Sequence, residues 1–258
     1  MYEYSKLNER AGVVNAYHPS DDMIINGQYL SQLIPGYQQL HVSGRGLLPR
    51  TINRDPIPRR AGSWYSYGQD EERIIEVTFK LEADQSEDLR ESYWQLNQFL
   101  RGQEDKPLEI KFRDDLNYHY YAYYADGGSE PEQSLTMIDK FSLICPDPYK
   151  YKDPKQSSGV VESKNYVQLL NIEATVKVNT QLITIKSGSE EIRLKGNYKN
   201  GDKIIIDFSD EIKVTQNSNN ILYELQLNSD LENFQLKAGQ AITCNEAAIE
   251  YEWREYRL

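Results

Sequence analysis

Alternating hydrophobic and polar residues in the first half of the chain predict strands with one buried face. Hydrophobic side chains take every second position over residues 75–81, with Glu, Thr and Lys between them. The same alternation recurs over 108–112. Strands are also expected at 118–124 and 135–145, separated by the turn signal Asp126-Gly127-Gly128. The first half is therefore expected to be built mainly from strands.

A single helix is predicted over residues 87–101. Asp84 or Ser86 is expected to cap its N-terminus, and Gly102 occupies the position of a C-terminal cap. The spacing of four, three and four residues places four hydrophobic side chains on one helical face: Leu89, Tyr93, Leu96 and Leu100.

The second half of the chain shows short β-type runs and no convincing helix. Turn signals such as Ser187-Gly188 and Asn200-Gly201 separate the runs, a spacing typical of an all-β sandwich. Alternation over 249–254 predicts a docked terminal strand. The expected strands are Ala174–Val178, Leu182–Ile185, Ile192–Leu194, Ile204–Phe208, Ile221–Leu227 and Ala241–Cys244.

Two domains are expected within the 258 residues. Residues 153–159 (D-P-K-Q-S-S-G) have the composition of a linker, so the boundary is placed there, between domains 1–152 and 153–258. Residues 1–22 lack clear periodicity and are expected to form an arm or a frayed end.

The most unusual segment is a long arm over about residues 44–68. Four Gly and three Pro between 43 and 70 oppose both helix and central strand, so an irregular loop is expected. Loops of this length inside compact domains are usually functional. The arm is basic in an acidic protein and ends in aromatic residues, and these residues form the candidate site: Arg45, Arg50, Arg54, Arg59, Arg60, Trp64, Tyr65 and Tyr67.

Three interpretations of the arm arginines are open. Arginine forks pair with carboxylates and with phosphates. The net charge of −11 opposes a chain that coats nucleic acid or an anionic membrane, so contact with the acidic surface of a neighbouring copy or partner is favoured. A solvated loop and a nucleic-acid contact are the alternatives. The 20 Tyr residues, against 6 Phe and 3 Trp, also favour a protein with extensive interfaces.

No catalytic, metal or cofactor site is predicted. The sequence has no phosphate-binding loop and no metal-ligand spacing among its 3 His and 2 Cys residues. Cys145 is expected to be a buried thiol, and Asp114-Asp115 a solvated turn. His119 lies in the Tyr-rich run 118–124, which is either an ordinary strand face or an aromatic platform for a sugar. No apolar run is long enough to span a membrane, and two cysteines fit folding in a reducing cytosol.

The order of these features resembles the distal tail proteins of long, non-contractile-tailed phages that infect Gram-positive bacteria. The resemblance covers roughly residues 23–258 and lies in the order of its motifs. They are Met23-Ile24-Ile25-Asn26-Gly27, Val42-Ser43-Gly44-Arg45, Glu72–Phe79 with the helix that follows, Tyr118–Tyr124, Gly201–Asp207, Leu231–Leu236, Ala238–Ile242 and Ile249–Arg254.

This resemblance implies a mainly β protein with two domains. The N-terminal domain would be β-sandwich-like with one helix and would form a ring of six copies, and the C-terminal domain would be a galectin-like sandwich facing outward. The ring would join the tail-tube protein to the tail-tip protein at the virion tail tip, after folding in the host cytoplasm. Receptor-binding proteins or a baseplate would attach to it, and no catalysis is implied.

Two other classes of function are weighed against this structural role. A carbohydrate-binding module is suggested by the β-sandwich and the Tyr-rich strand. A glycoside hydrolase rests only on scattered carboxylates. A sandwich fold does not by itself confer sugar binding, because a fold does not fix a function.

Overall fold

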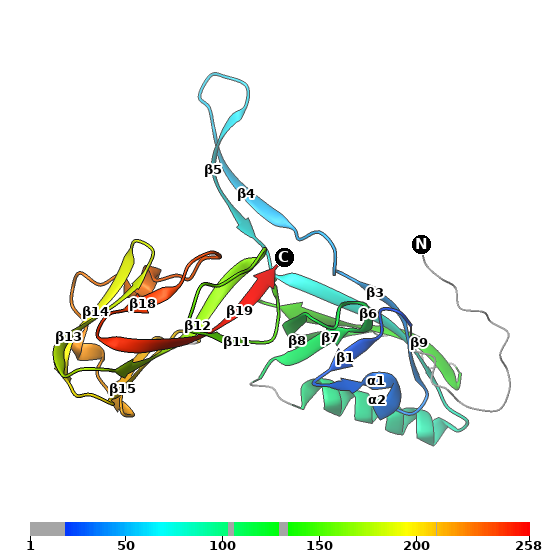
Figure 1. Ribbon diagram of the computed structural model, residues 1–258. Coiled ribbons are helices and arrows are strands. Elements are labelled where there is room, and N and C mark those ends of the chain that lie inside the picture. Colours follow the sequence, from blue (N-terminus) through cyan, green and yellow to red (C-terminus); the bar gives the residue numbers. More distant parts are fainter. Residues whose placement is uncertain (1–18, 103–105, 129–133, 210) are drawn as a thin grey trace. The chain divides into compact units, whose positions relative to one another are not determined.

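The computed structural model describes residues 19–102, 106–128, 134–209 and 211–258 of the chain (Figure 1). Most of the N-terminal segment 1–22 lies outside these residues. The chain divides into two compact units, and each is described by itself. The N-terminal unit runs to Leu116 and includes Tyr120–Pro148, and the C-terminal unit consists of Asn117–His119 and Tyr149–Leu258.

The strands of the N-terminal unit form one continuous hydrogen-bonded path. Its order is β3-β6-β9-β8-β7-β1-β2. A short helix, α1 (Leu30–Leu33), follows β2, and a 3-10 turn, η1 (Arg113–Asp115), follows β7. The strands are β1 (Met23–Ile25), β2 (Gln28–Tyr29), β3 (Tyr37–Ser43), β6 (Arg73–Glu82), β7 (Leu108–Phe112), β8 (His119–Gly127) and β9 (Thr136–Cys145).

The alternation seen in the sequence places one face of β6 and β9 in the core. Ile75, Val77 and Phe79 of β6 are buried there together with Phe141 and Leu143 of β9. Hydrophobic residues of α2 (Ser86–Arg101) complete this core, which confirms the predicted helix. Its buried side chains are Leu89, Ser92, Leu96 and Leu100.

The N-terminal cap of α2 differs from the predicted one, whereas the C-cap residue is the predicted Gly102. Gln85, rather than Asp84 or Ser86, is the N-cap residue, and no side chain caps the helix there. Glu87 and Asp88 in the first turn favour the helix dipole instead. Gly102 is the C-cap residue but has a right-handed φ of −61°, so the left-handed conformation that favours glycine is not used.

The arm forms a β-hairpin, so the expectation of an irregular loop was wrong. β4 (Arg50–Pro56) pairs antiparallel with β5 (Ser63–Asp70), and the two form a separate two-stranded sheet (Figure 1, cyan). Proline is tolerated because it stands at the end of β4, on a strand that has only one neighbour to bond. Gly62, with φ of +100°, supplies the turn before β5.

The C-terminal unit is a sandwich of two antiparallel sheets. One has the order β17-β16-β15-β12-β19, with β10 and β11 also on β19, and the other has the order β14-β13-β18. Hydrophobic side chains from both sheets, including Ile172, Ile185 and Ile206, fill the space between them. The strands are β10 (Lys150–Tyr151), β11 (Lys155–Ser157), β12 (Tyr166–Val176), β13 (Thr180–Ser187), β14 (Glu190–Tyr198), β15 (Lys203–Asp207), β16 (Lys213–Gln216), β17 (Asn219–Asn220), β18 (Ile242–Cys244) and β19 (Ala247–Arg257).

Two expectations for this half are corrected. The segment 153–159, expected to be a linker, contains β11, which pairs with β19 through Gln156 and its neighbours. The expected strand 221–227 instead contains the 3-10 turn η2 (Leu222–Glu224), because Ile221 is its one buried anchor while Leu222 and Tyr223 are exposed. A further 3-10 turn, η3, covers Leu231–Asn233. The mainly β fold class predicted from the sequence is confirmed.

Within the described ranges, no helix combines the length and the apolar character needed to cross a membrane.

Candidate subunit interface

The hairpin of β4 and β5, here called the arm, exposes large side chains to solvent. Trp64 is 66% exposed, Tyr65 63% and Tyr67 59%. Trp, Tyr and Arg are the residue types that contribute most to protein–protein binding energy. A two-stranded ribbon with open aromatic rings is only marginally stable by itself, so a covering surface would stabilise it.

The register of the arm gives it two chemically different faces. A bulge lies between Asn53 and Arg54, so that Arg54 stands opposite Tyr65 and Asp55 opposite Trp64. Because cross-strand partners share a face, one face is basic, and the other carries an acid and two aromatic rings. The first consists of Arg50, Ile52, Arg54, Tyr65 and Asp70, and the second of Thr51, Asn53, Asp55, Trp64 and Tyr67.

The arm arginines differ in how much of their charge is compensated. Arg50 lies 3.6 Å from the Asp70 carboxylate across the strands. Arg54 and, at the tip, Arg59 and Arg60 are exposed, and none of the three forms an ion pair with any described residue. Arg59 has φ of +59°, a left-handed conformation that is uncommon outside glycine. The outer part of the arm therefore carries three uncompensated positive charges.

Arg45 belongs to the root of the arm. Its guanidinium donates two hydrogen bonds to Asp114, at 3.0 and 2.6 Å, and lies 3.9 Å from the centre of the Phe112 ring. A two-pronged pair with a carboxylate, stacked on an aromatic ring, fixes an arginine in place. Arg45 is thus engaged within its own unit, unlike Arg54 and the tip arginines.

Arg73 is a second anchor at the root and was not among the residues predicted from the sequence. Its side chain is fully buried, and its guanidinium donates to the carbonyls of Gly44 at 2.8 Å, Gly46 at 3.2 Å and Pro148 at 2.9 Å. A buried cation is stable only when its donors are satisfied, and here backbone carbonyls supply the acceptors. The sequence did contain a signal for this role. Arg73 lies two residues before Ile75, so the alternation of β6 places both side chains on the core face.

Glycine is required at one root position. Gly44 has φ of +85°, and a Cβ there would lie 1.8 Å from the carbonyl oxygen of Ile74. The chain therefore passes against β6 as closely as a backbone can. Together with Arg45 and Arg73, this contact fixes where the arm leaves the sheet.

The Tyr-rich run 118–124 does not form an open platform for a sugar. Tyr118, His119 and Tyr120 are buried, whereas Tyr123 is 40% exposed. Cations cover the Tyr118 ring, with the Arg257 guanidinium 3.9 Å from its centre. Tyr118 and Tyr120 therefore pack inside the protein, as on an ordinary strand face, while Tyr123 stays exposed.

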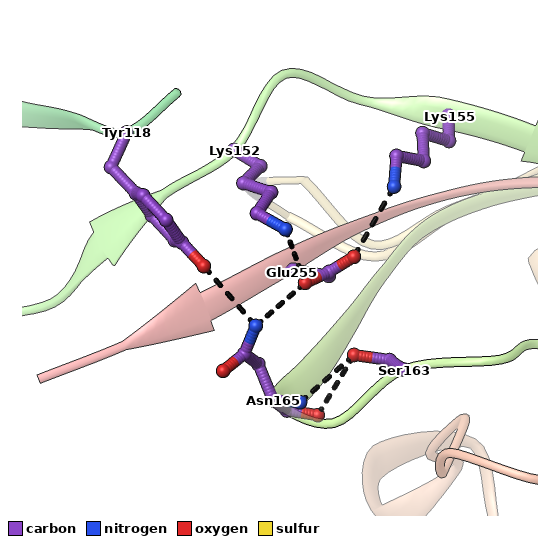
Figure 2. Close-up of polar contacts among 6 residues, drawn as sticks. All are labelled: Tyr118, Lys152, Lys155, Ser163, Asn165 and Glu255. Carbon is purple, nitrogen blue, oxygen red and sulfur yellow. Dashed lines mark hydrogen bonds and ion pairs between the residues drawn. The ribbon is translucent and has the colours of Figure 1, made fainter. Parts of the chain in front are cut away.

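A cluster of polar side chains surrounds Glu255 in the C-terminal unit (Figure 2). Lys152 donates to its carboxylate at 2.7 Å, Lys155 at 3.2 Å, and the Asn165 amide at 2.7 Å. The same amide donates to the Tyr118 hydroxyl at 3.1 Å. Burial alone would raise the pKa of Glu255, but the hydrogen bonds from Lys152, Asn165 and Lys155 outweigh burial and lower the pKa to about 2. The cluster ties β11, and the residues that directly follow β10 and precede β12, to β19.

Cys145 and Asp114, the side chains weighed as possible catalytic groups, are buried or hydrogen-bonded within the protein. Burial raises the pKa of the Cys145 thiol to about 12, so it stays protonated and unreactive at neutral pH. Asp114 accepts the hydrogen bonds of Arg45. Among the described residues, no three His, Cys, Asp or Glu side chains gather as a metal site would need. The arrangement is suited to binding other proteins through the arm.

The known proteins that this chain resembles come from phages. Residues 165–256 match the family described as siphovirus-type tail component, C-terminal domain. A search of curated protein sequences found no match. The fold is similar to that of the Dit protein of phage SPP1, described as a paradigm of the hub adsorption apparatus in phages infecting Gram-positive bacteria. The TM-score is 0.77 at 20% identity, over 92% of this chain and 99% of that one.

Chains of the phage P2 baseplate in its activated conformation are also similar. The structure with Ca has a TM-score of 0.51 at 12% identity, and the one with Sr has a TM-score of 0.51 at 11% identity. Each likeness covers 86% of this chain and 91% of the other.

The fold is mainly β, and residues 165–256 match the C-terminal domain family of siphovirus-type tail components. The resemblance to siphovirus distal tail proteins indicated by the sequence is confirmed by this match together with the SPP1 likeness.

Proposed function

We propose that the protein is a structural hub at the tail tip of a siphovirus virion, in which six copies close into a ring through their N-terminal units. The ring joins the tail-tube protein to the tail-tip protein, and receptor-binding proteins attach to it. The galectin-like C-terminal unit faces outward. The chain folds and assembles in the host cytoplasm and catalyses no reaction. The similarity to a phage hub protein and to baseplate chains supports this proposal.

The observation that carries the proposal is the arm. It places aromatic rings and uncompensated arginines on a ribbon that pairs with no other described strand. At about 3.3 Å per residue, the 7 residues of β4 carry the tip roughly 20 Å from the root. An arm of this reach fits a head-to-tail contact, in which one patch meets a different patch on the next copy and the rotation closes a ring.

The test reverses the charge of the arm. Arg54, Arg59 and Arg60 are replaced together by Glu, and the mass of the purified protein is measured by light scattering alongside negative-stain imaging. Wild type is expected to form six-fold annuli, alone or with its tail-tip partner, and the variant to remain monomeric. The matched control changes three exposed lysines of the C-terminal unit to Glu: Lys177, Lys195 and Lys213.

The control is expected to assemble as wild type does, because its charge change is equal but is made in the C-terminal unit and leaves the arm arginines in place. A variant with the reversed arm that still forms annuli would refute the role of the arm. A wild-type protein that stays monomeric with its tail-tip partner would refute the ring.

A further inference from the structure

A hollow in the N-terminal unit lies between α2 and the sheet of β6, β8 and β9. Its volume is about 270 Å³, and its lining combines aromatic rings with aliphatic residues and with Lys140. Trp94 of α2 stands at the rim and is 55% exposed. Tyr93 and Tyr124 line it together with Phe79. The hollow has no part in the arm or in the cluster around Glu255.

A buried carboxylate also lines this hollow. Asp139 is only 7% exposed, because it lies on the core face of β9 between Met137 and Phe141. It accepts a hydrogen bond from the Tyr93 hydroxyl at 3.1 Å and one from the backbone N–H of Lys140 at 2.8 Å. The Lys140 ammonium pairs with Glu76 at 2.9 Å.

Asp139 forms no ion pair with a cation anywhere in the described ranges. Burying a carboxylate without a counter-ion is costly, and a charged group kept in such a position is a candidate for a binding role. Gly128 adds to the enclosure, since a Cβ there would lie 1.7 Å from the Oδ1 atom of Asp139. The backbone thus closes directly over one carboxylate oxygen.

An aromatic hollow with a carboxylate in its lining suits a guanidinium group. Arginine stacks on aromatic faces and donates paired hydrogen bonds to carboxylates, and both interactions strengthen when water is excluded. The chain itself supplies such groups: Arg54, Arg59 and Arg60 are exposed on the outer arm without an acidic partner among the described residues. Lys140 also lines the hollow, but its ammonium pairs with Glu76 rather than with Asp139. Asp139 and the three outer-arm arginines therefore form no ion pair among the described residues, so the two surfaces are complementary at these positions.

We propose that this hollow is the receptor for the arm of a neighbouring copy, and that one arm arginine enters it to pair with Asp139. The proposal rests on the ring described above and names the surface that the arm contacts. Trp94 lies at the rim of the hollow, where the arm of the neighbouring copy would cover it. Tryptophan is among the residues that contribute most to the binding energy of protein interfaces.

The experiment is a double-mutant cycle on ring assembly in the full chain. Asp139→Asn keeps the side-chain shape and removes the charge, and it is combined with Arg54→Gln, Arg59→Gln or Arg60→Gln. Assembly is measured by analytical ultracentrifugation over a concentration series. Asp139→Asn is expected to weaken assembly at least tenfold without lowering the melting temperature, and one of the three arginine changes is expected to have no additional effect in its presence.

Two further variants keep the outcome clear. Trp94→Ala lies at the rim and is expected to weaken assembly even if Asp139→Asn were to misfold. Glu82→Gln removes an exposed acid of β6 that pairs with Lys80, and since neither residue lines the hollow, it is expected to leave assembly unchanged. Additive effects for all three arginines, or unchanged assembly in both Asp139→Asn and Trp94→Ala, would overturn the hollow as the receptor while leaving the ring intact. Absence of assembly in wild type with its tail-tip partner would overturn the ring and this inference together.

Discussion

Replacing Glu255 by Gln should remove a pH-dependent part of the stability of the C-terminal unit. The carboxylate has a folded-state pKa of about 2 against an ordinary value of 4.5. At about 1.36 kcal/mol per pKa unit, this difference corresponds to about 3 kcal/mol. Because the folded-state pKa is the lower one, the stabilisation is fully present above pH 4.5 and is lost as the pH falls toward 2.

The assay is urea unfolding of wild type and the variant between pH 7 and pH 2. Trp253 lies two residues from Glu255 on the same strand, so its fluorescence reports on this unit. The other two tryptophans, Trp64 and Trp94, are replaced by Phe in both proteins, because the two units need not unfold together. Glu250→Gln, an exposed position of β19, measures the effect of removing one negative charge from the strand.

Wild type is expected to be more stable than Glu255→Gln by up to about 3 kcal/mol at pH 7, with the difference vanishing near pH 2. The amide preserves the shape, so packing contributes little to the difference. A difference that stays constant from pH 7 to pH 2 would contradict the reasoning, since it would assign the effect to packing rather than to the ion pairs with Lys152 and Lys155.

Three further predictions concern the arm root and the buried thiol. Gly44→Ala should destabilise the N-terminal unit by more than about 1 kcal/mol, because the left-handed backbone and the Ile74 carbonyl both oppose a Cβ, whereas Gly46→Ala, which meets open space, should change the melting temperature little. Arg73→Met should lower the free energy of unfolding by about 3 kcal/mol, since three backbone carbonyls lose a charged donor; urea unfolding measures it, and a loss under 1 kcal/mol would count against the anchor. Cys145, with its pKa raised to about 12, should not react with a disulfide reagent at pH 8 until the protein unfolds; rapid labelling of that residue in the native protein would contradict its burial.

The spacing of hydrophobic residues along the chain predicts the regular strands and the long helix of the N-terminal unit. β6, β7 and β9 alternate cleanly, and the apolar spacing of α2 matches one helical face, so these elements could be predicted. The predicted N-cap of α2 was wrong, whereas Gly102 is the C-cap residue as expected. Several polar residues precede α2, and their order does not decide which one ends the extended backbone.

The arm shows where local rules mislead. Gly and Pro oppose a central strand, yet a ribbon of two strands bonds along one edge only, so β4 and β5 form in spite of them. Sequence located the arm but could not show that Arg45 is held by Asp114, which lies 69 positions further along the chain. Contacts over such separations depend on how β3 and η1 are brought together.

The position of a charged residue within a strand's alternation indicates whether it faces the core. Arg73 is in step with Ile75 and Val77, and Asp139 is in step with Phe141, so the alternation places both charges on the core face. A charge on the buried face of a strand needs an acceptor or a counter-ion, and such positions indicate either an anchor or a binding surface.

The short segment Asn117–His119 limits how the C-terminal unit can be exchanged between related proteins by recombination. This segment belongs to the C-terminal unit, although both flanking stretches belong to the N-terminal unit. The hydroxyl of its Tyr118 accepts a hydrogen bond from the Asn165 amide. A genetic crossover at residue 149 would therefore transfer the sandwich without one of its own pieces. Recombination between related phages should preserve Tyr118 and Asn165 as a pair, or replace both, so that inheritance of the second half is constrained by three residues encoded in the first.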